Sequence, residues 1–348
     1  MGTTDMRYRF LGRTGLLVSE LGVGTNTFGG QSARWKAFGA LDREGVGAVL
    51  RTAFDAGINL IDLADTYGDG ESETRVGEAL QDLGIARDLV ILADKACLRA
   101  GPGPNAVGLS RAHVFDSVEK SLRKLKTDYL DIFQLHNFDA STPLEETLGA
   151  LAILVQQGKV RYVGCSNFAA WQVALARGIA EAHGLPRIES VEANYTISAR
   201  VIERELIPLL HHQNMGLLVW GPLGAGLLTG KYDRKGGGPA GARLVSGGAT
   251  MANRERALDA VDVMRPIAKA HGVNVGRVAL AWLLAKPAVS SVIVGCKNSE
   301  QLQENLAALD LELTSEDMAS LDAVALLPPE YPMTMQASAA ADRLPKSV

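Results

Sequence analysis

The segment NLIDLADTYGDG, residues 59–70, joins a short apolar run to polar residues at its end. Seven similar apolar runs are spread along the chain, with longer amphipathic segments between them. The eight runs are ELGVGT (20–25), NLIDLA (59–64), LVILADK (89–95), YLDIFQLH (129–136), VRYVGCSN (160–167), IESVEANY (188–195), LLVWGPLG (217–224) and SVIVGCK (291–297). Strands that alternate with helices predict parallel β/α units. The segments RYRFLG (7–12) and LVSELGVGT (17–25) predict a hairpin outside this repeat.

The polar residues that follow the strands predict where an active site would lie. If the eight strands close into a barrel, the site is expected at their carboxyl ends. Five polar or aromatic residues fall at or just beyond such ends: Asp62, Lys95, His136, Asn167 and Tyr195. A length of 348 residues fits one large barrel as easily as two average domains.

Composition excludes several other functions. The chain is 47% hydrophobic and 21% charged, with a net charge of −4, so we expect no nucleic-acid or membrane partner. Cys97, Cys165 and Cys296 lie far apart, which argues against disulfides and zinc and favours the cytoplasm. No signal-peptide pattern, membrane-spanning run or HExxH motif occurs, and we expect no metal.

Tyr67 and three of these strand-end residues, Asp62, Lys95 and His136, suit proton transfer at a carbonyl oxygen. The phenol of Tyr67 is a weak acid at neutral pH, and a nearby Lys95 ammonium would lower its pKa by stabilising the phenolate. Asp62 could keep Lys95 charged while it is partly buried. His136 supplies a second donor that would orient the carbonyl. A positioned acid of this kind contributes about 10²–10⁴-fold to a rate.

Three segments lack a regular pattern. LRAGPGPNAVGLS (98–110) and residues 231–253 are Gly-rich, and the tail from Leu326 has neither helical nor strand rhythm. Because they follow predicted strand ends or end the chain, they could form the rim of the site.

These motifs together resemble those of the aldo-keto reductase family. The most specific stretch is GINLIDLADTYGDGESETRVGEAL (57–80), which keeps the family's spacing of Asp62 and Tyr67. Lys95 and the His136 of QLHN match the family's next two strands. The resemblance covers about residues 7–325 and implies one (β/α)8 TIM barrel domain with an N-terminal hairpin, extended C-terminal loops and a tail at 326–348. It also implies that Tyr67 and His136 meet the substrate.

The resemblance further implies a nicotinamide cofactor, with NADP(H) favoured and NAD(H) possible. VGCSNF (163–168) resembles the family's carboxamide-binding segment, WGPLGAGLLTGKY (220–232) its pyrophosphate loop and GCKNSEQLQEN (295–305) its adenosine segment. Lys297 and Gln301 would contact a 2′-phosphate, and helix N-termini suit such anions. The full predicted cofactor set is Gly24, Thr25, Asn26, Asp62, Ser166, Asn167, Glu192, Tyr195, Trp220, Gly221, Pro222, Leu223, Gly226, Lys231, Gly295, Lys297, Gln301, Glu304 and Asn305.

One position departs from the family pattern. Glu192 stands three residues before Tyr195, where the family usually has Gln. A carboxylate can accept a hydrogen bond from the carboxamide as an amide does. If Glu192 is ionised, we expect it to favour the oxidised, cationic nicotinamide; if it is protonated or turned away, we expect no effect. Tyr195 is expected to stack on the nicotinamide ring.

We therefore expect an enzyme that interconverts a small aldehyde or ketone and its alcohol by direct hydride transfer, with Phe28 and Asn137 beside the catalytic mouth. One alternative is a dehydrogenase that oxidises a sugar or secondary alcohol, favoured only by Glu192. Another is a cofactor-binding regulatory subunit on the same fold. A monomer or a small homo-oligomer is expected.

Overall fold

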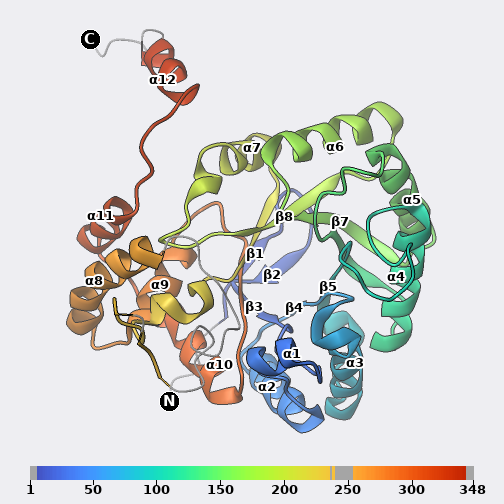
Figure 1. Ribbon diagram of the computed structural model, residues 1–348, viewed down its shortest axis with the longest axis horizontal. Coiled ribbons are helices and arrows are strands. Elements are labelled where there is room, and N and C mark those ends of the chain that lie inside the picture. Colours follow the sequence, from blue (N-terminus) through green and yellow to red (C-terminus); the bar gives the residue numbers. More distant parts are fainter. Residues whose placement is uncertain (1–5, 236, 240–253, 342–348) are drawn as a thin grey trace.

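Eight parallel strands form a closed barrel at the centre of the molecule (Figure 1). The computed structural model describes residues 6–235, 237–239 and 254–341, so most of the Gly-rich segment at 231–253 lies outside the described residues. The barrel strands are β3 (Leu21–Gly24), β4 (Leu60–Asp62), β5 (Ile91–Ala96), β6 (Leu130–Leu135), β7 (Val160–Ser166), β8 (Ile188–Asn194), β9 (Gly216–Trp220) and β10 (Ser291–Val294). Six lie within the predicted runs, while β5 and β9 each extend one residue beyond theirs, and β10 pairs with both β3 and β9 to close the ring. The predicted (β/α)8 barrel is confirmed.

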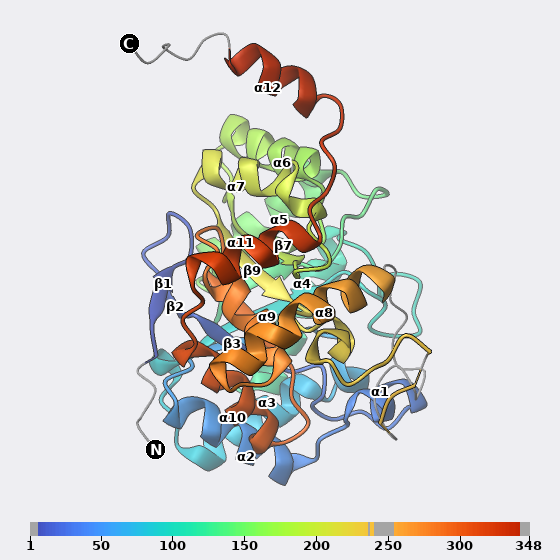
Figure 2. The same cartoon turned by 90° about the vertical axis from the view of Figure 1, so that its left-hand side faces the viewer.

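Helices surround the barrel and cover its outer face (Figures 1 and 2). Apolar residues on the helices pack against the outward side chains of the strands and form the larger part of the core. The helices are α1 (Ala33–Phe38), α2 (Arg43–Asp55), α3 (Ser72–Leu83), α4 (Arg111–Leu125), α5 (Leu144–Gln156), α6 (Ala170–His183), α7 (Leu206–Gln213), α8 (Arg254–His271), α9 (Val275–Leu284), α10 (Ser299–Leu306), α11 (Ser315–Val324) and α12 (Met333–Ala341).

An antiparallel hairpin precedes the barrel, as the sequence predicts. Within the described residues, its strands β1 (Tyr8–Phe10) and β2 (Leu17–Ser19) form a two-stranded sheet of their own. The hairpin residues Leu11 and Val18 pack against apolar side chains from the barrel strands. These partners are Leu60, Ile91, Ala93, Ile132, Leu218 and Ile293. The hairpin therefore closes the amino-terminal end of the barrel.

The strand periodicity places a polar layer directly above this apolar layer. Successive side chains of a strand point to opposite faces, so residues two apart share a face. Asp62, Lys95 and Gln134 each follow a member of the apolar cluster by two residues, and all three are buried. The barrel interior is thus apolar at its closed end and polar toward the carboxyl ends of the strands.

The C-terminal tail differs from the expectation of an irregular segment, because it contains helix α12. This helix lies away from the body of the molecule in both ribbon views (Figures 1 and 2). Its sequence MTMQASAAA is rich in strong helix formers but lacks an apolar stripe, and for this reason periodicity did not reveal it. An ion pair of 2.7 Å between Arg204 and Glu330 ties the preceding tail segment to the barrel.

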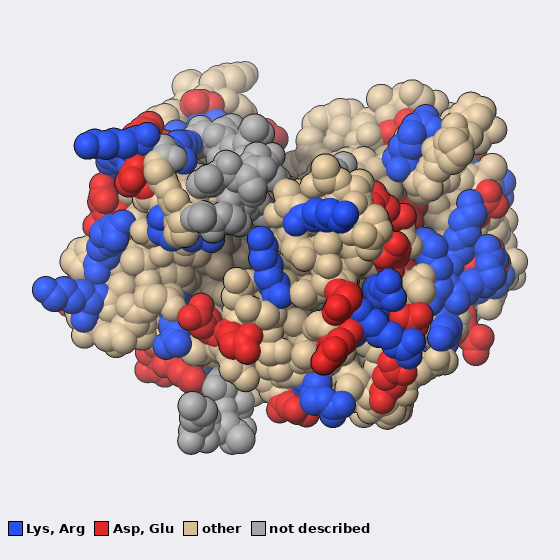
Figure 3. All heavy atoms as spheres, turned by 60° about the horizontal axis from the view of Figure 1, so that its bottom comes forward, with Lys and Arg blue, Asp and Glu red and all other residues tan. Residues whose placement is uncertain are grey.

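Surface charge on the face below α1, α2 and α10 is mixed. Figure 3 shows Lys and Arg interspersed with Asp and Glu over this face, in line with the small net charge. Among the described helices, none is long and apolar enough to cross a membrane.

Candidate active site

The four predicted proton-transfer residues meet at the carboxyl ends of β4, β5 and β6. Lys95 Nζ donates to Asp62 Oδ1 at 2.5 Å and to the carbonyl oxygen of Leu63 at 2.9 Å. The ring of Tyr67 lies edge-on to that of His136, with centroids 5.9 Å apart, and Lys95 Nζ lies 5.2 Å from the Tyr67 ring centre. Residues 74 positions apart in sequence therefore form one cluster.

The backbone after β4 fixes the position of Tyr67. Gly68 has φ of 59° and a side chain there would overlap the carbonyl oxygen of Phe28, so only glycine fits this turn. The Tyr67 N–H donates to the carbonyl of Ala64 at 3.1 Å. On its open side, the Tyr67 ring meets the edge of Trp35, with centroids 5.9 Å apart. The phenol is thus held by a tight turn below and an aromatic ring beside it.

Burial dominates the protonation of Tyr67 and His136. Burial raises the pKa of Tyr67 above its usual value, and the nearby Lys95 ammonium only partly opposes this shift. This rise is opposite to the lowering of the Tyr67 pKa that Lys95 alone would cause. Tyr67 is less desolvated than Lys95, because part of the tyrosine surface is exposed. Burial, aided by the charge of Lys95, lowers the pKa of His136 to about 3. At neutral pH the site therefore holds a protonated phenol and a neutral imidazole.

Glu192 joins this cluster from β8. Its Oε2 lies 3.2 Å from Lys95 Nζ and accepts a hydrogen bond of 2.7 Å from Gln134 Nε2. Glu192 is 2% exposed and Lys95 is fully buried. Burial lowers the pKa of Lys95, but Asp62 and Glu192 outweigh this effect and hold it well above its usual value. In place of the family's amide, this chain has a second carboxyl bound to the same ammonium.

The residues predicted to bind the carboxamide end β7. Ser166 Oγ is buried and meets no hydrogen-bond partner within the described part of the chain, so a ligand amide could satisfy it. Asn167 has φ of 59°, donates to the carbonyl of His136 at 3.0 Å and accepts from Trp220 Nε1 at 3.0 Å. Asn167 thereby connects the ends of β6, β7 and β9.

The predicted pyrophosphate loop forms a glycine-rich turn after β9. Gly221, Gly224 and Gly226 all have positive φ, and the turn leads into the short helix η4 (Gly224–Thr229). A Cβ at Gly226 would lie 2.9 Å from Lys231 Nζ, so the lysine folds back over this turn. Open backbone beside a lysine ammonium suits a phosphate group.

The predicted adenosine segment lies next to the end of β3. A Cβ at Gly295 would come within 3.2 Å of Asn26 Oδ1, which is buried and has no partner among the described residues. Gln301 Oε1 accepts from the Lys297 N–H at 2.9 Å, at the start of α10. Glu304 is exposed on the same helix. The predicted cofactor residues thus follow the rim from β7 through β8, β9 and β10 to β3, beside the arc that carries the four predicted proton-transfer residues.

The structure places the predicted site residues Tyr195 and Phe28 in the core and Asn137 at the rim. Tyr195 is 1% exposed, packs against Trp282 with ring centroids 5.3 Å apart and donates its hydroxyl to Glu203, so its ring has no open face for stacking. Phe28 is fully buried and belongs to the core, whereas Asn137 is half-buried at the rim beside His136. The burial of Tyr195 and Phe28 conflicts with the contacts predicted for them.

Sequence reasoning missed three residues of the site. Trp35 lies against Tyr67, and Phe38 packs on Trp35 with centroids 5.5 Å apart. Gln134, two residues before His136 in the sequence, donates a hydrogen bond to Glu192. The two-residue period of a strand could have revealed Gln134 as a member of the site. Trp35 and Phe38 lie in the short helix α1, which carries no motif, so only the fold brings Trp35 to Tyr67 and Phe38 to Trp35.

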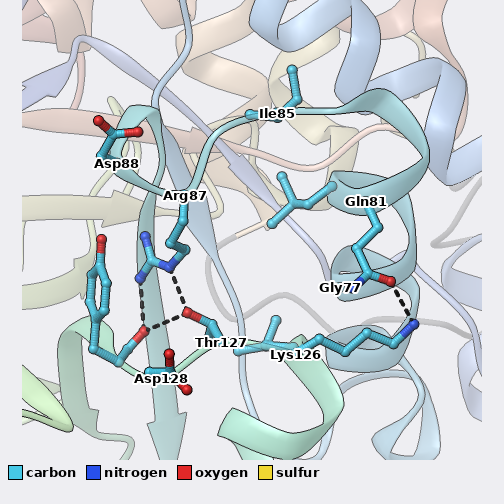
Figure 4. Close-up of a pocket in the computed structure, with 11 residues that line it drawn as sticks. Gly77, Gln81, Ile85, Arg87, Asp88, Lys126, Thr127 and Asp128 are labelled. Carbon is cyan, nitrogen blue, oxygen red and sulfur yellow. Dashed lines mark hydrogen bonds between the residues drawn. The ribbon is translucent and has the colours of Figure 1, made fainter.

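Two hollows of about 440 and 410 Å³ lie at the opposite, amino-terminal pole and are not part of this site. In the larger one, Arg87 donates to Thr127 and to the carbonyl oxygen of Tyr129, while Lys126 donates to Gln81 (Figure 4). Because these polar groups satisfy one another, the hollow reads as structural packing at the pole where a β/α barrel keeps its stabilising contacts.

Comparison with known proteins identifies relatives along nearly the whole chain. The profile of the Aldo/keto reductase family matches residues 20–326. The chain is 38% identical to a probable voltage-gated potassium channel subunit beta of Oryza sativa subsp. japonica, over 92% of this chain and 96% of that protein. It is 36% identical to aldo-keto reductase AMT2 of Alternaria alternata, over 90% of each chain. It is 34% identical to L-glyceraldehyde 3-phosphate reductase of Escherichia coli O157:H7, over 91% of this chain and 92% of that protein.

Proposed function

Because the chain belongs to the aldo/keto reductase family and is therefore an oxidoreductase enzyme that acts on a small molecule, we propose that it interconverts an aldehyde or ketone and its alcohol with NADP(H). In this proposal, the chain from about residue 7 to about residue 325 forms a single domain. The observation that supports it most is the adjacency of two arcs on one barrel rim. Asp62, Tyr67, Lys95 and His136 occupy β4 to β6, and the cofactor residues occupy β7 to β3.

The chain's own residues fit a nicotinamide cofactor. Ser166 and Asn167 would hold the carboxamide, the turn at Gly226 with Lys231 the pyrophosphate, and Lys297 with Gln301 the 2′-phosphate. Trp220 takes the stacking role in place of Tyr195, because its ring is 38% exposed and its Nε1 is bound to Asn167. When bound, the cofactor supplies or accepts the hydride at the carbonyl carbon.

The catalytic arc handles the proton at the carbonyl oxygen. Tyr67, which is protonated at neutral pH, donates its proton to the oxygen during reduction and takes it back during oxidation. The neutral imidazole of His136 donates a hydrogen bond that orients the oxygen. Lys95 favours the phenolate that Tyr67 becomes, and Asp62 holds Lys95 in place. Trp35 shields the phenol from one side.

A turnover assay with a single variant tests this function. NADPH oxidation with an aromatic aldehyde is expected to fall by about 10²–10⁴-fold in Tyr67→Phe, while the Kd for NADPH stays within about threefold. Tyr8→Phe, which removes a hydroxyl that donates to Gly57 far from the site, should keep full activity. Unchanged turnover in Tyr67→Phe would contradict the proposed acid. A comparison of the Kd values for NADPH and NADH decides between the two cofactors.

A regulatory subunit is the second candidate, because the rice relative is described as a probable channel subunit. On that function the wild-type protein would bind NADPH but turn over neither the aldehyde nor a panel of sugars and secondary alcohols. The same panel with oxidised cofactor tests the dehydrogenase alternative, which predicts faster oxidation than reduction.

A further inference from the structure

The polar layer of the barrel interior contains more carboxyl groups than ammonium groups around Lys95. Lys95 Nζ is the meeting point, 2.5 Å from Asp62 Oδ1 and 3.2 Å from Glu192 Oε2. Its third proton is taken by the carbonyl of Leu63. Both carboxyl side chains are at most 4% exposed, so water does little to stabilise a surplus charge.

Among the described residues, the groups that face this pair supply no second cation. From β6, Gln134 is uncharged and burial keeps His136 neutral, with its pKa lowered to about 3. From η1 (Tyr67–Gly70), Tyr67 is a neutral phenol, since burial raises its pKa. Ser166 of β7 contributes only a hydroxyl. The local sum is therefore one ammonium against two carboxyl groups.

The charges of Lys95, Asp62 and Glu192 balance if the two carboxyl groups hold one proton between them. Two like charges that share a site cannot both ionise without a large penalty. Burial raises the pKa of Asp62 well above its usual range, and the charge of Glu192 raises it further, against the opposing pull of Lys95. Two buried carboxyl groups within 3.2 Å of one ammonium give the same result as the charge count, namely one proton held between them.

We propose that Asp62 and Glu192 share one proton in the cofactor-free enzyme, and that binding of the oxidised cofactor releases this proton to solvent whereas binding of the reduced cofactor does not. The inference rests on the proposed function, which places the nicotinamide beside Ser166, Asn167 and Glu192. An oxidised ring carries one positive charge, which favours ionised carboxyls, and a reduced ring is neutral. The released proton leaves Asp62, Glu192 and Lys95 with one net negative charge, which the ring balances.

The consequence is a cofactor preference that depends on pH. Where one proton is released on binding, the Kd falls up to tenfold for each unit of rising pH. The phosphate and adenine groups are common to both cofactor forms, so their titration cancels when the two Kd values are divided. The ratio of Kd for NADP⁺ to Kd for NADPH should thus fall with rising pH across the interval in which the pair loses its proton.

Isothermal titration calorimetry measures the released proton directly. The full-length protein is titrated with NADP⁺ and with NADPH between pH 6 and 9, in phosphate and in Tris, whose ionisation enthalpies differ. We expect the wild type to release up to about one proton more with NADP⁺ than with NADPH within this range. Glu192→Gln and Asp62→Asn each leave a single carboxyl opposite Lys95 and should both abolish the difference.

Glu189→Gln is the matched control, because Glu189 lies on the same strand β8 but at the amino-terminal end, paired with Arg187 at 3.4 Å. It should keep the wild-type proton difference. Equal proton counts for the two cofactor forms in the wild type, or a difference that persists in Glu192→Gln, would overturn the inference alone. Failure of both cofactors to bind would overturn the proposed function and this inference with it.

Discussion

Replacing Lys95 by methionine should make the stability of the cofactor-free protein strongly dependent on pH. Methionine keeps most of the side-chain volume but removes the ammonium that contacts Asp62, Glu192 and the carbonyl of Leu63. Two buried carboxyls then remain without a cation. Removing one partner from a buried ion pair destabilises a protein by about 3–5 kcal/mol.

The sign of the pH dependence follows from proton counts. In the unfolded chain both carboxyls titrate near pH 4. Folded Lys95→Met must keep both Asp62 and Glu192 protonated, one proton more than the wild type. Because the native state then binds more protons than the unfolded state, stability falls as pH rises. One extra proton corresponds to about 1.4 kcal/mol per pH unit, so the gap to the wild type should widen by about 3 kcal/mol between pH 6 and pH 8.

Urea unfolding at pH 6, 7 and 8 provides the measurement. The double variant Lys95→Met/Glu192→Gln holds one buried proton, as the wild type does, so its gap should stay constant with pH. Lys286→Met is the control, because its partner Asp322 is 42% exposed and stays ionised without it. Stability curves for Lys95→Met and the wild type that run parallel over this range would refute the proton count.

Two further predictions concern stability outside the active site. Burial, with the charge of Glu73, raises the pKa of Asp65 to about 7, so the native state binds one more proton than the unfolded state between about pH 4 and 7. The free energy of unfolding therefore falls by up to about 4 kcal/mol as pH rises through that window. Urea unfolding of Asp65→Asn should show this loss removed, and an unchanged dependence of stability on pH would contradict the prediction. Gly77→Ala should destabilise the protein by about 1–3 kcal/mol, because a Cβ there would lie 2.6 Å from the carbonyl oxygen of Lys124. Gly47→Ala, whose Cβ would meet nothing within 4 Å, should stabilise it by about 0.5–1 kcal/mol in the same assay.

The strand pattern was sufficient to predict the fold and the position of the four predicted proton-transfer residues. Apolar runs of the right length fixed eight strands, and the rule that barrel sites lie at carboxyl strand ends brought Asp62, Lys95 and His136 together. Tyr67 follows from its short distance along the chain to Asp62. These predictions succeed because they depend on local periodicity and on a single topological rule.

Other features depend on contacts that the sequence does not contain. Tyr195 ends a strand as the pattern requires, yet its ring turns toward Trp282 because the hydroxyl finds Glu203 there. Trp35 reaches Tyr67 from the short helix α1, which carries no motif. Helix α12 has helix-forming composition without an apolar stripe, so no periodicity predicts it. In each case a tertiary contact or an isolated propensity decides the outcome.

Glu192 shows how the layered barrel interior allows one residue to change the chemistry without changing the fold. The apolar layer at the hairpin end makes the barrel stable, and the polar layer above it is shielded from water on that side. Charge in such a layer must be balanced by neighbours within it, because the effective dielectric is low and solvent is excluded. A glutamate of similar size to glutamine fits the same position and binds the same neighbours, Lys95 and Gln134. On the shared-proton proposal, what changes is the number of protons that this polar layer holds when a nicotinamide ring of either charge binds beside it.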